Sequence, residues 1–155
     1  MLLYHEKYDR WQAGAHAGTF RGNQMAMVAG TTVMEVLLEQ DLVATVRDKG
    51  AYLQAALTHL AQTYPEIGDV RGRGLMWGLE IVDPRSEPDP RLGSRRADCA
   101  RARAIQQACL AHGLILETGG RHGAVLRLLP PLIISFAELS EVVSTLELAL
   151  IATAA

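Results

Sequence analysis

The stretch that decides the fold is residues 67–82, which read IGDVRGRGLMWGLEIV. Residues 67–71 and 75–82 are rich in the apolar and β-branched side chains that favour strands. Between them lies Gly72-Arg73-Gly74, which predicts a turn. The spacing suits a β-hairpin or two bent sheet segments, so we expect a sheet in the middle of the chain.

Helices are expected before this segment. Asn23 is a suitable N-cap for a helix over residues 24–39, and Asp41 for a second helix that Pro65 ends. Apolar side chains lie on more than one side of the first helix, so we expect it to bury a second face against a further domain. Residues 2–4, Leu-Leu-Tyr, indicate the stump of a strand.

The C-terminal half continues the alternation of helices and strands. A helix is expected over residues 95–112, and Ser135-x-x-Glu138 forms a capping box that opens a last helix. Between them we expect three short strands, at residues 114–117, 125–129 and 132–134. This order predicts an α+β fold, in which helices cover one face of a small, mainly antiparallel sheet.

Composition excludes several classes of function. The 155 residues suffice for one domain with a single core, and 15 Lys and Arg against 17 Asp and Glu leave a charge of -2. This balance argues against a nucleic-acid-binding or polybasic membrane-binding surface. No uncharged apolar run approaches the roughly 20 residues that cross a bilayer, and the N-terminus has no signal-peptide pattern. Together with two cysteines that are too far apart to bridge, this predicts a cytoplasmic protein.

The first candidate for chemistry is residues 18–23, GTFRGN, just ahead of the first predicted helix. Free amides and the positive end of the helix dipole attract a phosphate there, and the Thr19 hydroxyl can donate to a phosphate oxygen. Thr and Asn also cap helices, and glycine forms turns, in proteins that bind no phosphate. From these residues alone both explanations stay open.

The second candidate is Arg127, in the apolar run Val-Leu-Arg-Leu-Leu of residues 125–129. Alternation places it on the face opposite Leu126 and Leu128, where a guanidinium needs an anion if it is buried. That anion can be a substrate carboxylate or a structural glutamate, and water at a sheet edge is a third possibility. The five histidines share no ligand spacing with acids or cysteines, so no metal site is expected.

Three motifs in order resemble the class III aminotransferases, pyridoxal-phosphate enzymes of fold type I. They are GAHAGTFRGNQ at residues 14–24, VRGRGLMWGLE at 70–80 and GGRHGAVLRLLPPL at 119–132. Within the family, GTFRGNQ is most similar to the diaminobutyrate–2-oxoglutarate aminotransferases. The resemblance implies a C-terminal small domain over residues 25–155, preceded by a long linking helix. Residues 1–24 would be the end of a large domain together with the phosphate-contact loop.

The resemblance also implies roles for individual residues. Thr19, flanked by Gly18 and Phe20, would contact the phosphate of the neighbouring subunit's pyridoxal phosphate across a homodimer. Arg127 would contact the substrate carboxylate, or pair with an active-site glutamate when the other substrate is bound. The reaction would exchange an amino group between 2,4-diaminobutyrate and 2-oxoglutarate, with aspartate semialdehyde and glutamate as the other pair.

The chain departs from the family in one respect. The family's cofactor-bearing large domain, with its Schiff-base lysine, precedes the segment that this sequence matches. Lys7 and Lys49 are the two lysines, and neither lies in the catalytic lysine's motif. We therefore expect no catalytic residue here, and activity only with the large domain in cis or trans. Two alternatives are a non-catalytic remnant that serves as a binding or dimer-contact module, and a free-standing phosphate-binding domain.

Overall fold

The structure is a computed structural model that describes residues 5–15 and 17–154. It divides into two compact units, Met1–Gln40 and Asp41–Ala155. The strand predicted at residues 2–4 lies outside the described residues. The functional division predicted between residues 24 and 25 stays a prediction.

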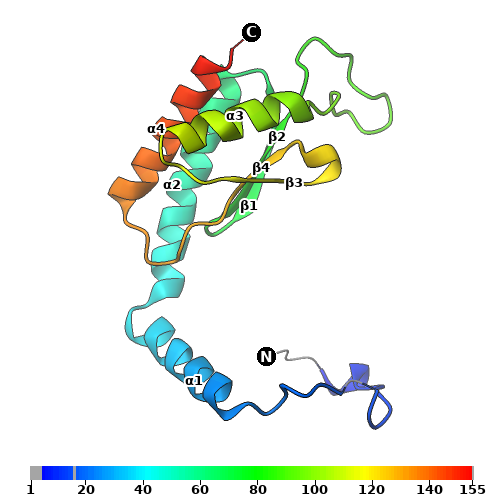
Figure 1. The fold of residues 1–155 in the computed structure, drawn as a ribbon, viewed down its shortest axis with the longest axis vertical. Helices are drawn as coiled ribbons and strands as arrows, with labels where there is room; N and C mark the ends of the chain where they lie inside the picture. The colour runs from blue at the N-terminus through cyan, green and yellow to red at the C-terminus, as the bar shows by residue number, and fades with distance from the viewer. Residues whose placement is uncertain (1–4, 16, 155) are drawn as a thin grey trace. The chain divides into compact units, whose positions relative to one another are not determined.

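The first unit ends in the helix predicted for residues 24–39. A short 3-10 helix, η1 (Glu6–Tyr8), is followed by a loop with turns and by α1 (Gln24–Glu39), as Figure 1 shows. Asn23 caps α1 as predicted, because its side-chain oxygen accepts a hydrogen bond of 3.3 Å from the Ala26 amide. No residue of α1 is buried, and its exposed side chains include Met25 and Leu38.

The second unit contains a four-stranded antiparallel sheet in the order β1-β2-β4-β3. The strands are β1 (Ile67–Arg73), β2 (Met76–Ile81), β3 (Glu117–Gly119) and β4 (Val125–Leu128). The segment at residues 67–82 is therefore a hairpin, the first of the two arrangements that its spacing allows. The second hairpin arm, β2, pairs with β4 from the C-terminal half.

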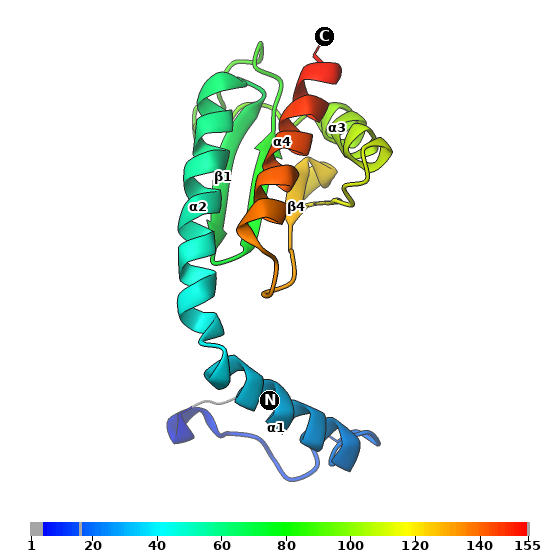
Figure 2. The same cartoon turned by 90° about the vertical axis from the view of Figure 1, so that its left-hand side faces the viewer.

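Three helices cover one face of this sheet: α2 (Leu42–Thr63), α3 (Cys99–Ala111) and α4 (Phe136–Ala152). Figure 2 shows α4 between α2 and α3. The inward side chains of the strands, such as Leu79 and Leu126, are fully buried against leucines of α2 and α4. This arrangement confirms the predicted α+β fold.

Glycines set how closely α2 approaches the hairpin. A Cβ atom on Gly50 of α2 would lie 2.7 Å from the carbonyl oxygen of Gly74 in the β1–β2 turn. Gly74 itself has φ +58°, a backbone conformation that residues other than glycine rarely adopt. The turn predicted at residues 72–74 is corrected: Gly72 and Arg73 belong to β1, and the chain reverses at Gly74 and Leu75. The backbone of Gly74 and its contact with α2 fix this turn.

A solvent-exposed loop joins β2 to α3, and its two ends are tied together. Val82 and Ala97 form an isolated antiparallel bridge beyond the sheet. The buried Asp83 carboxylate accepts a hydrogen bond of 2.7 Å from the Arg96 guanidinium, and the Asp83 amide donates to the Arg96 carbonyl. Hydrogen bonds from Arg85 and Arg96 hold the pKa of Asp83 below its ordinary value.

The predicted helix starts are corrected in two places. Asp41 does not cap α2 with its side chain, because it adopts a left-handed backbone with φ 42°. The helix predicted from residue 95 begins only at Cys99, because Asp98 supplies the cap: its side chain accepts a hydrogen bond of 2.9 Å from the Arg101 amide.

Two predicted strands are also corrected. Residues 114–116 do not pair, and β3 starts at Glu117, where the register with β4 begins. Residues 132–133 form a turn rather than a strand, closed by a hydrogen bond from the Ile134 amide to the Pro131 carbonyl. The adjacent prolines lack the amides that a ladder needs, which favours the turn.

The cysteines differ in environment. Cys109 lies in the core, where burial raises the pKa of its thiol to about 11, whereas Cys99 is exposed. Cys109 therefore serves packing, whereas Cys99 lies on the surface at the start of α3.

The capping box of α4 yields a pH-dependent prediction. The Ser135 amide and hydroxyl both donate to the Glu138 carboxylate, at 2.7 Å each, and together with the charge of Lys49 they lower the pKa of Glu138 below its ordinary 4.5. The ionised Glu138 therefore stabilises the folded chain. This stabilisation is fully present above pH 4.5 and is lost as the pH falls through the lowered pKa of Glu138. Glu138→Gln should lower the free energy of unfolding at pH 7 and change it much less in acid, measured by urea denaturation.

Glu141→Gln, one turn further along α4, is the matched control and should leave the pH dependence unchanged. Ser135→Ala should cost about 1 kcal/mol at pH 7. Equal effects of Glu138→Gln at neutral and acid pH would contradict this account.

Candidate functional site

The candidate phosphate-binding segment forms a compact turn directly ahead of α1. The Arg21 amide donates to the Gly18 carbonyl at 3.1 Å, and the Asn23 amide donates to the Phe20 carbonyl at 3.3 Å. Gly22 has φ +75°, so the chain reverses at a glycine before the helix begins. Local hydrogen bonds within the segment thus fix the position of Thr19 relative to the start of α1.

Thr19 and Phe20 are both open to solvent on this turn. The Phe20 ring is 87% exposed, which is unusual for a large apolar side chain. Over the part of the chain that the structure describes, the Thr19 hydroxyl makes no hydrogen bond. A helix of 16 residues follows, and its N-terminal amides and dipole favour an anion. The segment can therefore offer a free hydroxyl and a positive helix end to an anionic group.

Arg127 lies on a central strand and not at a sheet edge, because β4 pairs with β2 on one side and β3 on the other. This excludes the sheet-edge explanation. Its side chain is 44% exposed on the face of the sheet opposite the helices, so it is not the buried charge that its apolar neighbours suggested. Its Nη1 atom lies 3.3 Å from Oε2 of Glu117 on β3.

The Glu117 carboxylate is thus a partner from the chain itself. Its side chain is 69% exposed, and an ion pair between two exposed groups contributes little to stability. Such a pair leaves the guanidinium able to bind another carboxylate. Arg127 and Glu117 both line a hollow of about 450 Å³ whose other walls are mainly apolar and include Ile115 and Pro130.

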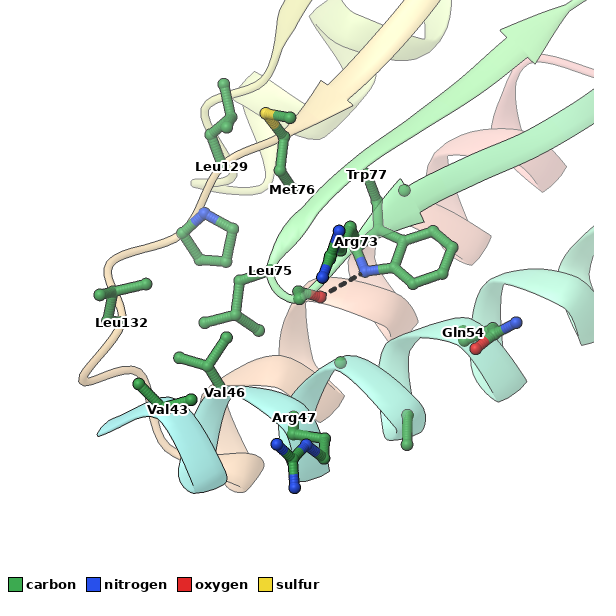
Figure 3. Close-up of a pocket in the computed structure, with 15 residues that line it drawn as sticks. Val43, Val46, Arg47, Gln54, Arg73, Leu75, Met76, Trp77, Leu129 and Leu132 are labelled. Atoms are coloured by element: carbon green, nitrogen blue, oxygen red, sulfur yellow. Dashed lines mark hydrogen bonds between the residues drawn. The ribbon is translucent and has the colours of Figure 1, made fainter. Parts of the chain in front are cut away.

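A larger groove of about 700 Å³ runs between the start of α2, the β1–β2 turn and residues 129–132. Trp77 is one of its lining residues, and Figure 3 shows the indole Nε1 donating to the Gly74 carbonyl, at 2.7 Å. Arg47 points away from the apolar side chains of the groove. The groove is mostly apolar and contains none of the predicted site residues.

The two lysines occupy different surroundings. Lys7 is exposed in η1, with its ammonium 4.9 Å from the centre of the Tyr8 ring. Lys49 is buried in α2, and its Nζ donates to the Leu132 carbonyl at 3.1 Å. Sequence reasoning did not predict the burial of Lys49. Its spacing from Leu42, Val46 and Leu53 could have placed it on the buried stripe.

The two parts of the predicted site lie in different units. Gly18, Thr19 and Phe20 share one turn of the first unit, and Arg127 lies in the second. Across residues 5–15 and 17–154, no three His, Cys, Asp or Glu side chains gather into a group that could hold a metal. In the same residues, no helix combines the length and apolarity that a bilayer crossing requires.

Residues 1–150 match the family model described as aminotransferase class III. The chain belongs to this family. A diaminobutyrate–2-oxoglutarate aminotransferase of Rhizobium meliloti (strain 1021) is 50% identical over 142 residues, which cover 92% of this chain and 30% of the relative. Another, from Haemophilus influenzae, is 43% identical over 91% of this chain and 31% of its own length. The chain thus spans about a third of the length of these relatives.

A solved structure of similar fold is the pyridoxamine-phosphate-bound form of an aminotransferase from Vibrio fluvialis. It has a TM-score of 0.62 and 30% identity over 77% of this chain and 25% of that one. Enzymes of this class use pyridoxal phosphate. The family assignment made from the three motifs is therefore confirmed, and so is the cofactor class of the family.

The hydrogen bond of the buried Lys49 gives a prediction about stability. Lys49→Met keeps the apolar stem but removes the donor to the Leu132 carbonyl, so the free energy of unfolding should fall by about 1–3 kcal/mol. The exposed Lys7→Met variant is the control and should unfold within about 0.5 kcal/mol of the original chain. Equal stability of the two variants in urea would show that the hydrogen bond is dispensable.

Proposed function

We propose that this chain is the C-terminal part of a pyridoxal-phosphate-dependent aminotransferase. The enzyme exchanges an amino group between 2,4-diaminobutyrate and 2-oxoglutarate, with aspartate semialdehyde and glutamate as the other pair. The observation that carries the proposal is the exposed, unpaired hydroxyl of Thr19 ahead of α1, within a motif that resembles the diaminobutyrate enzymes. The names of the two relatives support the same substrates.

The residues of the turn fit the phosphate of this cofactor. Thr19 would donate a hydrogen bond from its hydroxyl to a phosphate oxygen, and the positive end of α1 would stabilise the charge of the phosphate. Gly18 has no side chain to block the approach, and the exposed Phe20 ring offers an apolar surface beside it. Pyridoxal phosphate, when bound, accepts the amino group from one substrate and passes it to the other. In this proposal the cofactor belongs to the neighbouring subunit of a homodimer.

Arg127 recognises the carboxylate of the substrate. A planar guanidinium can hold a carboxylate through two parallel hydrogen bonds, which fixes its orientation as well as its charge. The side chain projects from a sheet that is anchored by a buried core on its other face, so the guanidinium starts from a rigid base. It is partly exposed and therefore accessible to a small acid.

The lysine that holds the cofactor comes from a large domain, supplied in cis or in trans. Neither lysine of the chain fits that role, since Lys49 is buried and bonded to a carbonyl and Lys7 lies outside the motif. Cytoplasmic localisation is part of the proposal and is supported by two free cysteines, which suit a reducing compartment.

Thr19→Ala tests the phosphate contact. The chain is combined with a cofactor-bearing large domain from a diaminobutyrate aminotransferase, and the dissociation constant of pyridoxal phosphate is measured by fluorescence. Because the variant loses a hydrogen bond to a charged group, that constant should rise about tenfold or more. Thr19→Ser should restore it.

Thr31→Ala is the matched control, because the Thr31 hydroxyl bonds to the Met27 carbonyl within α1. Equal cofactor affinity of Thr19→Ala and Thr31→Ala would count against the contact. An assembly that binds no cofactor and has no transaminase activity would favour the non-catalytic binding or dimer-contact module.

Arg127→Gln tests carboxylate recognition in the same assembly. The KM for 2-oxoglutarate should rise at least tenfold, since a charge-assisted, two-point contact is lost. Arg71→Gln is the control: Arg71 lies on the same face of the sheet but pairs with Asp69 and Glu80. A similar KM in both variants would remove Arg127 from the proposed site.

A further inference from the structure

We infer that two residues of β3, Glu117 and Gly119, position Arg127 and tune its affinity for carboxylates. This inference rests on the proposed role of Arg127. Glu117 acts as a counter-ion that a substrate carboxylate displaces, and Gly119 provides the space for the stem of the arginine. Both are positioning residues, because they act through Arg127.

The register of the sheet brings the three residues together. β3 has three residues, and each pairs with β4: Glu117 with Arg127, Thr118 with Leu126 and Gly119 with Val125. Side chains alternate between the two faces of a strand, so Glu117 and Gly119 lie on the face of Arg127, opposite the helices. Arg127 therefore has an acid directly across the ladder and a residue without a side chain diagonally beside it.

The ion pair holds the guanidinium weakly enough to exchange. Its atoms are 3.3 Å apart and both side chains are largely open to water, so attraction and the cost of ordering two side chains nearly cancel. A substrate carboxylate that binds with two parallel hydrogen bonds can replace the single contact to Glu117. When no substrate is bound, Glu117 keeps the Arg127 guanidinium near the position where it binds a carboxylate. When a substrate arrives, Glu117 competes weakly with it for Arg127.

Gly119 leaves space for the arginine stem, and its backbone conformation does not need a glycine. Its φ lies outside the left-handed range, so the backbone itself would accept another residue. A Cβ atom there, however, would lie 2.9 Å from Cδ of Arg127, closer than real Cβ contacts come. An alanine must therefore push the arginine stem away from β3 and move the guanidinium with it.

No other acid on this face competes for Arg127 in the described part of the chain. Asp69 and Glu80, the nearest acids along the sheet, both bond to Arg71, at 2.5 and 2.8 Å. The Glu117 carboxylate in turn has Arg127 as its one hydrogen-bond donor among those residues. The face therefore carries two separate charge clusters, and removal of Glu117 affects only the second.

The pairing is tested first without substrate. In the full chain labelled with ¹⁵N, the Nε–H resonance of Arg127 is assigned by its loss in Arg127→Lys. Glu117→Gln should shift this resonance, and Glu80→Gln, which removes a counter-ion of Arg71, should not. An unchanged Arg127 resonance in Glu117→Gln would overturn the inference, whatever the enzyme's function.

The exchange is tested by titrating the same samples with 2-oxoglutarate. Glu117→Gln should bind it up to about fivefold more tightly than the original chain, the range expected for an exposed ion pair. Gly119→Ala should bind it more weakly, with an unchanged far-ultraviolet circular dichroism spectrum. In the assembled enzyme, Glu117→Gln should lower the KM for 2-oxoglutarate and Gly119→Ala should raise it, and both variants should leave kcat nearly constant.

The outcomes separate the inference from the proposed function. If Arg127→Gln abolishes binding while Glu117→Gln and Gly119→Ala bind like the original chain, the exchange is wrong and the role of Arg127 stands. If Arg127→Gln leaves the KM for 2-oxoglutarate unchanged in the assembly with the large domain, the proposed carboxylate role is wrong, and the exchange falls with it.

Discussion

The β2–β4 ladder is the constraint on which the rest of the second unit depends. It joins Trp77 to Leu128 and Leu79 to Leu126, and so connects the hairpin of the first half to the C-terminal half. Pairing of strands so far apart in the sequence costs chain entropy. The burial of apolar side chains in the core between the sheet and the helices offsets this cost. The same ladder places Arg127 opposite Gly78, so the arginine emerges on the outer face beside a residue without a side chain. Fold and candidate binding residue are thus set by one pairing.

The two units contribute different kinds of chemistry to the proposed enzyme. The first offers a hydroxyl and a helix start, which suit an anion held by neutral donors and a dipole. The second offers a guanidinium on an open sheet, which suits a carboxylate. In the proposed enzyme, this third of the chain length supplies recognition groups, and the catalytic lysine comes from the large domain.

Sequence reasoning succeeded where a local pattern carries the structure. The Asn23 cap and the Ser135–Glu138 capping box follow from residue type and a spacing of three, and the structure has both. It failed where the outcome depends on partners distant in the sequence. The Glu117–Arg127 pair needs the register between β3 and β4, which no local pattern predicts. The three motifs nevertheless identified the family, because they preserve residue identities as well as patterns.

The bridge between Val82 and Ala97 and the bond from Arg96 to Asp83 close the long loop at its base. Residues 84–95 therefore begin and end at nearly the same place, and their length has little influence on the ladder. Insertions there cost only the slowly rising entropy of a larger ring. An extra surface element or an internal peptide tag could therefore be inserted in this loop without change to the β2–β4 ladder.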